Sequence, residues 1–178
     1  MGPARGYRWI MDAKSRERWQ PPNYNTVDPY LPVKGVPAFI EFLVKAFAAK
    51  EELRVPDPDG SIGHAEVRIG GSVLLMFDSK ETWPATPAFL RVYVEDADAT
   101  FRQALDAGAT SLTPLQNSFL GERGGRVKDP FDNIWWIVTR VEELSDEEKW
   151  KRAGEPPYIE NMRIAQQTFD DEMRSRLT

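Results

Sequence analysis

Residues 88–108 read AFLRVYVEDADATFRQALDAG, and this stretch contains the pattern that decides the fold. Apolar side chains occupy every second position from Leu90 to Val94, which is the period of a strand with one buried face. From Asp96 onward the apolar residues recur three or four positions apart, and Gly108 follows as a natural helix end. The stretch therefore predicts a strand followed directly by a helix.

The same pattern occurs once more, 61 residues earlier in the chain. Residue identity between the two halves is low, so the repeat rests on the order of elements and on the apolar positions. Under this shift four apolar pairs coincide: Leu31 with Val92, Val33 with Val94, Ile40 with Phe101, and Ala46 with Ala107.

The remaining turn signals complete two β-α-β-β-β modules, at 25–80 and 86–141. Gly70-Gly71 is typical of a hairpin, and Asp129-Pro130 is typical of a turn between strands. The expected class is α+β. We expect strands at 26–33, 52–55, 62–69, 73–77, 88–95, 111–115, 125–128 and 133–140, and helices at 37–49 and 96–107.

Five stretches in this order resemble the vicinal oxygen chelate superfamily, in its PhnB-like, glyoxalase/bleomycin-resistance branch. The resemblance covers residues 25–141 and implies that the two modules form a curled mixed sheet around a concave pocket. The stretches are YLPVKG at 30–35, IEFLVKAF at 40–47, DGSIGHAEVRIG at 59–70, LRVYVEDAD at 90–98 and GERGGRVKDPF at 121–131.

Many members of this superfamily hold a divalent metal at four positions related by the repeat. The resemblance places these positions at or next to Asp28, Leu75, Phe89 and Trp136. A catalytic divalent site needs several nitrogen or oxygen donors, and three of these side chains have none that binds a metal. We therefore expect a member without metal and without another cofactor.

Strand alternation predicts which side chains face the pocket. Phe89, Arg91 and Tyr93 should face it, while their neighbours face the helices. The face is apolar and aromatic with few charges, a composition that suits a planar organic ligand, although these aromatics could also simply fill the interior. The expected ligand-binding residues are Asp28, Tyr30, Leu75, Phe77, Phe89, Arg91, Tyr93, Phe119 and Trp136.

Several charged residues have both a structural and a functional interpretation. Arg91 facing an apolar pocket needs an anionic partner, which is either Asp28 or a ligand. His64 shares a strand face with Glu66, and the couple is either a general base or an ordinary pair on a solvated face, the second being favoured. Glu122 lies in a glycine-rich turn and, like Arg123 and Arg126 beside it, could reach the pocket mouth.

Composition excludes several classes of function. The chain has 178 residues, no cysteine, one histidine and a net charge of −5. Disulfide scaffolds, thiolate metal sites and thiol nucleophiles are therefore excluded, and nucleic acid is not the expected partner because phosphate binding needs a basic surface. We expect no membrane association and a cytoplasmic location, since the sequence shows neither an apolar run of about 18 residues nor a signal-peptide core.

The two ends lie outside the repeat, at 1–24 and 142–178. Ser145 and Glu148 have the spacing of a capping box, and residues from 158 onward predict an amphipathic helix. Its stripe should pack either on the body of the same chain or against a second copy, and we expect a homodimer. The expected stripe is Ile159, Met162, Ala165, Phe169, Met173 and Leu177.

Two hypotheses about function follow. The first is a protein that binds a small hydrophobic or aromatic molecule in its pocket without a metal. The alternative is a metal-independent lyase, isomerase or cyclase that uses Asp28, His64, Glu66 or Glu122 as acid–base groups.

Overall fold

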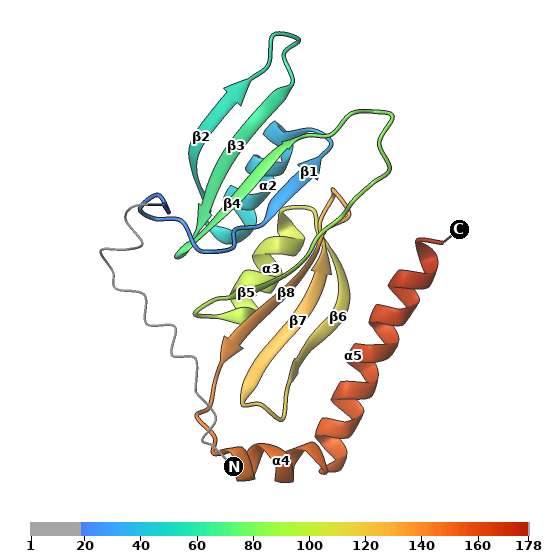
Figure 1. The fold of residues 1–178 in the computed structure, drawn as a ribbon. Helices are drawn as coiled ribbons and strands as arrows, with labels where there is room; N and C mark the ends of the chain where they lie inside the picture. Colours follow the sequence, from blue (N-terminus) through green and yellow to red (C-terminus); the bar gives the residue numbers. More distant parts are fainter. Residues whose placement is uncertain (1–18, 178) are drawn as a thin grey trace, which may run out of the picture.

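The computed structural model describes residues 19–177 and contains two four-stranded mixed sheets, each with one helix on its outer face (Figure 1). In the first module β1 (Tyr30–Val33) is followed by α2 (Val36–Phe47), β2 (Lys50–Pro56), β3 (Ile62–Ile69) and β4 (Ser72–Asp78). In the second, β5 (Phe89–Tyr93) is followed by α3 (Ala97–Asp106), β6 (Thr110–Asn117), β7 (Glu122–Lys128) and β8 (Ile134–Arg140).

The duplication predicted from the sequence is confirmed in the strand order. The sheets have the orders β1-β4-β3-β2 and β5-β8-β7-β6, which coincide when each module is read from its own first strand. In both sheets the first strand runs parallel to the fourth, and the other pairs are antiparallel. The predicted α+β class is thus correct, and within residues 19–177 the strands form two separate sheets.

An aspartate side chain caps the N-terminal end of each module helix. The Asp78 carboxylate accepts hydrogen bonds from the backbone N–H groups of Gly35 and Val36, so the end of β4 caps the start of α2. Asp96 caps α3 by accepting from Ala99 N. Each helix is thereby set directly after the first strand of its module.

The core lies between the sheets and the two helices, which pack against each other. Alternation places Leu31, Val67 and Met76 of the first sheet, and Val127 and Ile137 of the second, on the helix-facing sides, where all are nearly fully buried. The opposite face of each sheet, which we call its inner face, points away from α2 and α3.

One predicted strand is shorter than expected. β1 begins at Tyr30, four residues later than the predicted start at 26. Asp28 lies ahead of it in a turn, where its carboxylate accepts hydrogen bonds from the backbone and side-chain nitrogens of Asn25 at 3.0 and 2.7 Å. The sequence had predicted that Asp28 lies in the first strand, and this prediction is wrong.

Two helices follow the modules, α4 (Asp146–Ala153) and α5 (Pro156–Ser175). Ser145 caps α4 by accepting from Glu148 N, so the predicted cap is confirmed. Figure 1 shows α5 running along the second sheet, on the side of β6. Within residues 19–177, no helix combines the length and apolar character that crossing a bilayer requires. The predicted N-terminal extension covers residues 1–24, and its residues 1–18 lie outside the described residues.

Candidate functional site

The inner face of the second sheet carries a row of three large side chains in register. Arg91 of β5 pairs with Trp136 of β8, and Trp136 pairs with Arg126 of β7. The two guanidinium carbons lie 4.5 and 4.6 Å from the centre of the indole ring. An indole thus lies between two cations, within the range of cation–π attraction.

Helix α5 covers this face with polar as well as aromatic contacts. Phe169 stacks on Phe89 with ring centres 5.0 Å apart. The Oγ1 atoms of Thr113 and Thr168 are 2.7 Å apart. The Asn161 carbonyl oxygen accepts from the side chain of Gln116 at 2.7 Å.

The predicted apolar stripe of this helix is wrong in part. Ile159 is 49% exposed and Leu177 is 86% exposed, so these two do not form the buried side, and Met162 lines a cavity and stays 42% exposed. The helix instead turns Thr168 and the nearly buried Glu172 toward the sheet, because the sheet offers polar and charged partners there. Of the two predicted positions for the helix, the body of the same chain is the one observed.

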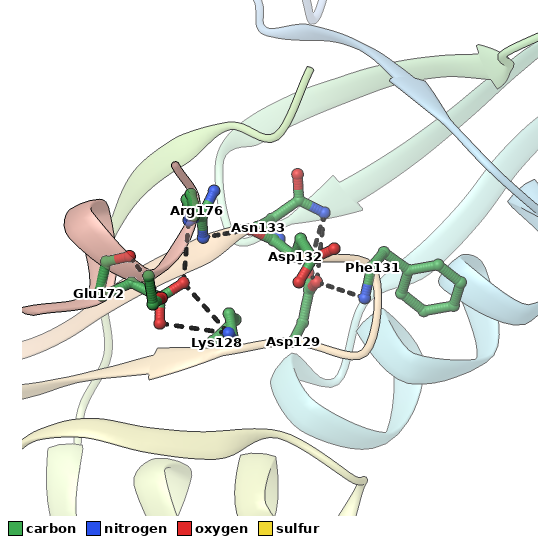
Figure 2. Close-up of polar contacts among 8 residues, drawn as sticks. Lys128, Asp129, Phe131, Asp132, Asn133, Glu172 and Arg176 are labelled. Carbon is green, nitrogen blue, oxygen red and sulfur yellow. Dashed lines mark hydrogen bonds and ion pairs between the residues drawn. The ribbon is translucent and has the colours of Figure 1, made fainter. Parts of the chain in front are cut away.

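A charged cluster ties the far end of α5 to the turn between β7 and β8 (Figure 2). Glu172 accepts from Lys128 Nζ at 3.1 Å and from Arg176 Nε at 2.8 Å. Arg176 Nη2 also donates to the Asp132 carbonyl oxygen at 2.9 Å. Burial raises the pKa of Glu172, but the hydrogen bonds from Lys128 and Arg176 outweigh it, so the pKa of this carboxyl is lowered.

A cavity of about 280 Å³ lies between α5 and the inner face of the second sheet. Its sheet side includes Trp136, Arg126 and Val138, and Gly124 lets the Trp136 and Val138 side chains lie close to β7, because a Cβ there would be 3.3 Å from Trp136 Nε1 and 3.0 Å from Val138 Cγ2. Both aromatic and uncharged polar groups therefore surround it. The other lining residues are Thr113, Gln116, Asn117, Ser118, Phe119, Leu120, Glu122, Gly125, Asn161, Met162, Ala165 and Gln166.

A larger hollow, of about 530 Å³, runs along the seam between the modules and includes Arg91 and Tyr93. The charged groups there are already paired. Glu122 accepts from both Arg91 Nη2 and Tyr93 Oη, the latter at 2.8 Å. The hydrogen bond to Glu122 also raises the pKa of the Tyr93 phenol. We therefore place the candidate site in the cavity under α5.

The expected pairing of Arg91 with Asp28 does not occur. Arg91 bonds to Glu122, which lies two strands away on the same face, whereas Asp28 bonds to Asn25. The sequence offered both carboxylates, but only the strand register shows which one is within reach. Arg123 likewise turns away from the pocket, since its guanidinium binds Asp98 of α3 on the opposite face.

The inner face of the first sheet holds a hydrogen-bonded chain of four residues. His64 Nε2 lies 2.9 Å from Glu66 Oε1, and His64 Nδ1 lies 3.3 Å from the Tyr30 hydroxyl. Tyr24 donates to the other oxygen of Glu66 at 2.6 Å. The bonds from His64 and Tyr24 lower the pKa of Glu66, so Glu66 is the anionic member of the chain and lies between these two residues.

The predicted site residues divide between the two sheets. Phe119, Glu122 and Trp136 come together in the cavity under α5, and Phe89 packs beside it under Phe169. Tyr30, Leu75 and Phe77 lie on the first sheet with His64 and Glu66. Sequence reasoning left Arg126 off the ligand-binding set, although the alternation of Glu122, Gly124 and Arg126 along β7 could have placed it on the inner face.

The four positions at which the family pattern holds a metal do not fit one here. Asp28 is engaged by Asn25, and Leu75 has no donor atom. Phe89 stacks on Phe169, and Trp136 lies between two cations. Among residues 19–177, no three histidine or carboxylate side chains are grouped so that they could hold a metal ion.

Comparison with known proteins identifies the class to which this fold and site belong. The family model described as Glyoxalase/Bleomycin resistance protein/Dioxygenase superfamily matches residues 25–137. The chain therefore belongs to this superfamily, as the motifs predicted. An uncharacterized protein of Mycobacterium bovis is 38% identical over 133 residues, covering 68% of this chain and 88% of that protein.

Solved structures show the same fold. The PhnB protein from Bacillus cereus is similar with a TM-score of 0.51 and 17% identity, covering 65% of this chain and 99% of that one. The fosfomycin resistance protein FosX from Listeria monocytogenes, in complex with Mn(II), has a TM-score of 0.53 and 18% identity, covering 72% of this chain and 96% of that one. At these identities the likeness concerns the fold alone.

Proposed function

We propose that this protein is a metal-free member of its superfamily that binds a small hydrophobic or aromatic molecule in the cavity under α5. The observation that carries the proposal is the cavity itself, which has the Trp136 indole on its sheet side and the chain's own C-terminal helix opposite. Ligand pockets are typically concave, mostly apolar and equipped with a few polar groups that orient the ligand.

Tryptophan fluorescence tests this proposal. A panel of one- and two-ring aromatic molecules is titrated into the full chain, and at least one member should give a saturable change. Because the chain has six tryptophans, Trp136→Phe identifies the source of the signal. Trp83→Phe is the matched control, since Trp83 contacts Phe77 of the first sheet and does not line the cavity.

A change that saturates in the wild type and in the Trp83 variant, but not in the Trp136 variant, supports the proposal. No saturable change with any panel member contradicts it. The metal-free part is tested separately, by elemental analysis of protein purified without chelator and by repeating the titration in EDTA. A stoichiometric divalent metal, or loss of binding in EDTA, contradicts that part.

The second candidate function is metal-independent acid–base catalysis on the first sheet, favoured by the Tyr30–His64–Glu66 chain. With Glu66 ionised, His64 donates from Nε2 and accepts the Tyr30 proton at Nδ1, an arrangement that suits a general base. Binding of an aromatic ligand that is unaffected by Trp136→Phe but abolished by His64→Phe would favour this site over the cavity.

We also propose a homodimer, formed through the inner face of the first sheet. Tyr30, Leu53 and Val55 are 52%, 43% and 44% exposed there. On the equivalent face of the second sheet, α5 covers part of the surface. Exposed apolar residues gathered on one face are typical of an interface. Light scattering on the full chain tests this, and a monomeric mass at micromolar concentration contradicts it.

A further inference from the structure

Arg126 holds a positive charge that no acidic residue in the described part of the chain neutralises. Its Nη1 donates to the Ala165 carbonyl oxygen of α5 at 2.7 Å. Its Nε is shut off from solvent and has no hydrogen-bond partner among residues 19–177. No Asp or Glu in that range lies within 4.0 Å of the guanidinium.

Other arginines of the chain show what this group normally binds. In Arg54, Arg68 and Arg123, the Nε and Nη2 atoms together hold one carboxylate. This two-point contact is the strongest that a guanidinium makes with an anion. In Arg126 the same pair of atoms holds nothing within the described residues.

Aromatic rings surround this charge but do not cancel it. The guanidinium carbon lies 4.6 Å from the Trp136 ring, 5.2 Å from the Phe169 ring and 5.7 Å from the Phe89 ring. Cation–π contacts attract a cation but supply neither an opposite charge nor a hydrogen-bond acceptor. Burial lowers the pKa of Arg126, so the cation is disfavoured by its surroundings and gains from any anion that comes beside it.

The cavity next to Arg126 has no free negative charge to repel an anion. Only two of its lining residues are charged, Glu122 and Arg126. Both oxygens of Glu122 are occupied, by Arg91 and Tyr93. The remaining polar lining residues are neutral amides and hydroxyls, which can donate to an anion as well as accept.

We propose that the cavity under α5 selects a small aromatic carboxylate of one or two rings, whose carboxylate pairs with Arg126 and whose ring packs on Trp136. This inference rests on the proposed function and adds the charge and anchor of the ligand. The volume supports the size, because about 280 Å³ is just below the usual span of ligand pockets, roughly 300–1,000 Å³, and so suits a small ligand.

Matched pairs of probes with one ring and two head groups test the charge preference. Benzoate is compared with benzamide, and 2-naphthoate with 2-naphthamide, by calorimetry on the full chain at pH 7. The wild type should bind each carboxylate at least about tenfold tighter than its amide, because a hydrogen bond between two charged groups is roughly twice as strong as one between neutral groups.

Three variants assign that preference to one side chain. Arg126→Met should bring acid and amide to equal affinity, and Arg126→Lys should keep part of the preference because the charge remains. Arg123→Gln is the matched control, three positions away on the opposite face of β7, and should keep the full preference. Circular dichroism checks folding, and the wild-type comparison stands even where Arg126→Met does not fold.

Each outcome has a distinct meaning. Equal affinity of the wild type for acids and amides overturns the anion selection but leaves the proposed function standing. If none of the four probes binds and no member of the fluorescence panel gives a saturable change, both the anion selection and the proposed function are overturned. A carboxylate preference that persists in Arg126→Met, or that disappears in Arg123→Gln, overturns the role of Arg126.

Discussion

Asp129 is a buried carboxylate that accepts several hydrogen bonds from the turn between β7 and β8 and from the start of β8. Its buried carboxylate accepts from Phe131 N at 2.8 Å, Asn133 N at 2.9 Å and Trp135 Nε1 at 2.8 Å. Burial raises the pKa of this group, while the same hydrogen bonds act in the opposite direction. The side chain thereby shapes the turn that positions β8, and with it Trp136 in the cavity.

We predict that Asp129→Ala destabilises the protein by about 3 kcal/mol, because a buried donor left without a partner costs roughly 1–3 kcal/mol and four donors, Asn133 Nδ2 among them, are affected with incomplete additivity. Denaturant unfolding measures the change. Asp129→Asn, which keeps one carbonyl oxygen, should cost less. The control Asp106→Ala changes an exposed carboxylate at the end of α3 and should have little effect. Equal losses in Asp129→Ala and Asp106→Ala would contradict the prediction.

At the scale of elements, α5 is fixed by charge as much as by apolar packing. Glu172 is a nearly buried carboxylate on this helix, and it lies between Lys128 of β7 and Arg176 of its own last turn (Figure 2). A carboxyl whose pKa is lower in the folded protein stabilises the fold above its unfolded pKa, about 4.3, and this stabilisation is lost as the pH falls through the folded pKa.

We predict that lowering the pH from 6 to 3 destabilises the wild type more than it destabilises Glu172→Gln, because the variant has already lost the titrating group. The melting temperature of both proteins is measured across that range. Glu160→Gln is the matched control, since Glu160 pairs with Arg163 on the exposed side of the same helix. It should keep the acid sensitivity of the wild type, because exposed pairs contribute little. Parallel pH profiles for wild type and Glu172→Gln would contradict this role of Glu172.

Element order and helix periods could be predicted from the sequence, whereas the docking of α5 could not. The two matching β-α patterns are local signals, and they were enough to predict the order of elements in both modules. A helical period shows that an amphipathic helix exists, but it does not show that Ile159 faces outward while Thr168 and Glu172 turn toward the sheet. There Arg126 binds a carbonyl oxygen of the helix and Lys128 binds the Glu172 carboxylate. That choice depends on contacts between distant segments. The same holds for Arg91, whose partner depends on the register of β5, β8 and β7.

At the scale of the whole molecule, the two modules share one core but differ in what covers their inner faces. Phe47 of α2 contacts Trp135 of β8 with ring centres 4.6 Å apart, and Phe39 contacts Phe131 at 5.2 Å, so the modules pack as one body. The second sheet is covered by α5 of its own chain. The C-terminal segment is therefore part of the folded unit and one wall of the candidate site.

Removing residues 155–178 tests this assignment. The deletion removes the Phe169 ring that stacks on Phe89 and removes one wall of the cavity beside Trp136. Phe169 is partly buried, so its packing is worth roughly the lower end of 1.5–3 kcal/mol, and each 1 kcal/mol shifts Tm by about 2–4 °C in a chain of this length. We therefore predict a fall in Tm of at least about 3–6 °C and loss of the fluorescence response to aromatic ligands. Light scattering should show an unchanged oligomeric state, because α5 packs on its own chain and the exposed face of the first sheet remains. A truncated protein that keeps its Tm would show that α5 is a solvated appendage, and one that turns from dimer to monomer would move the helix into the interface between two copies.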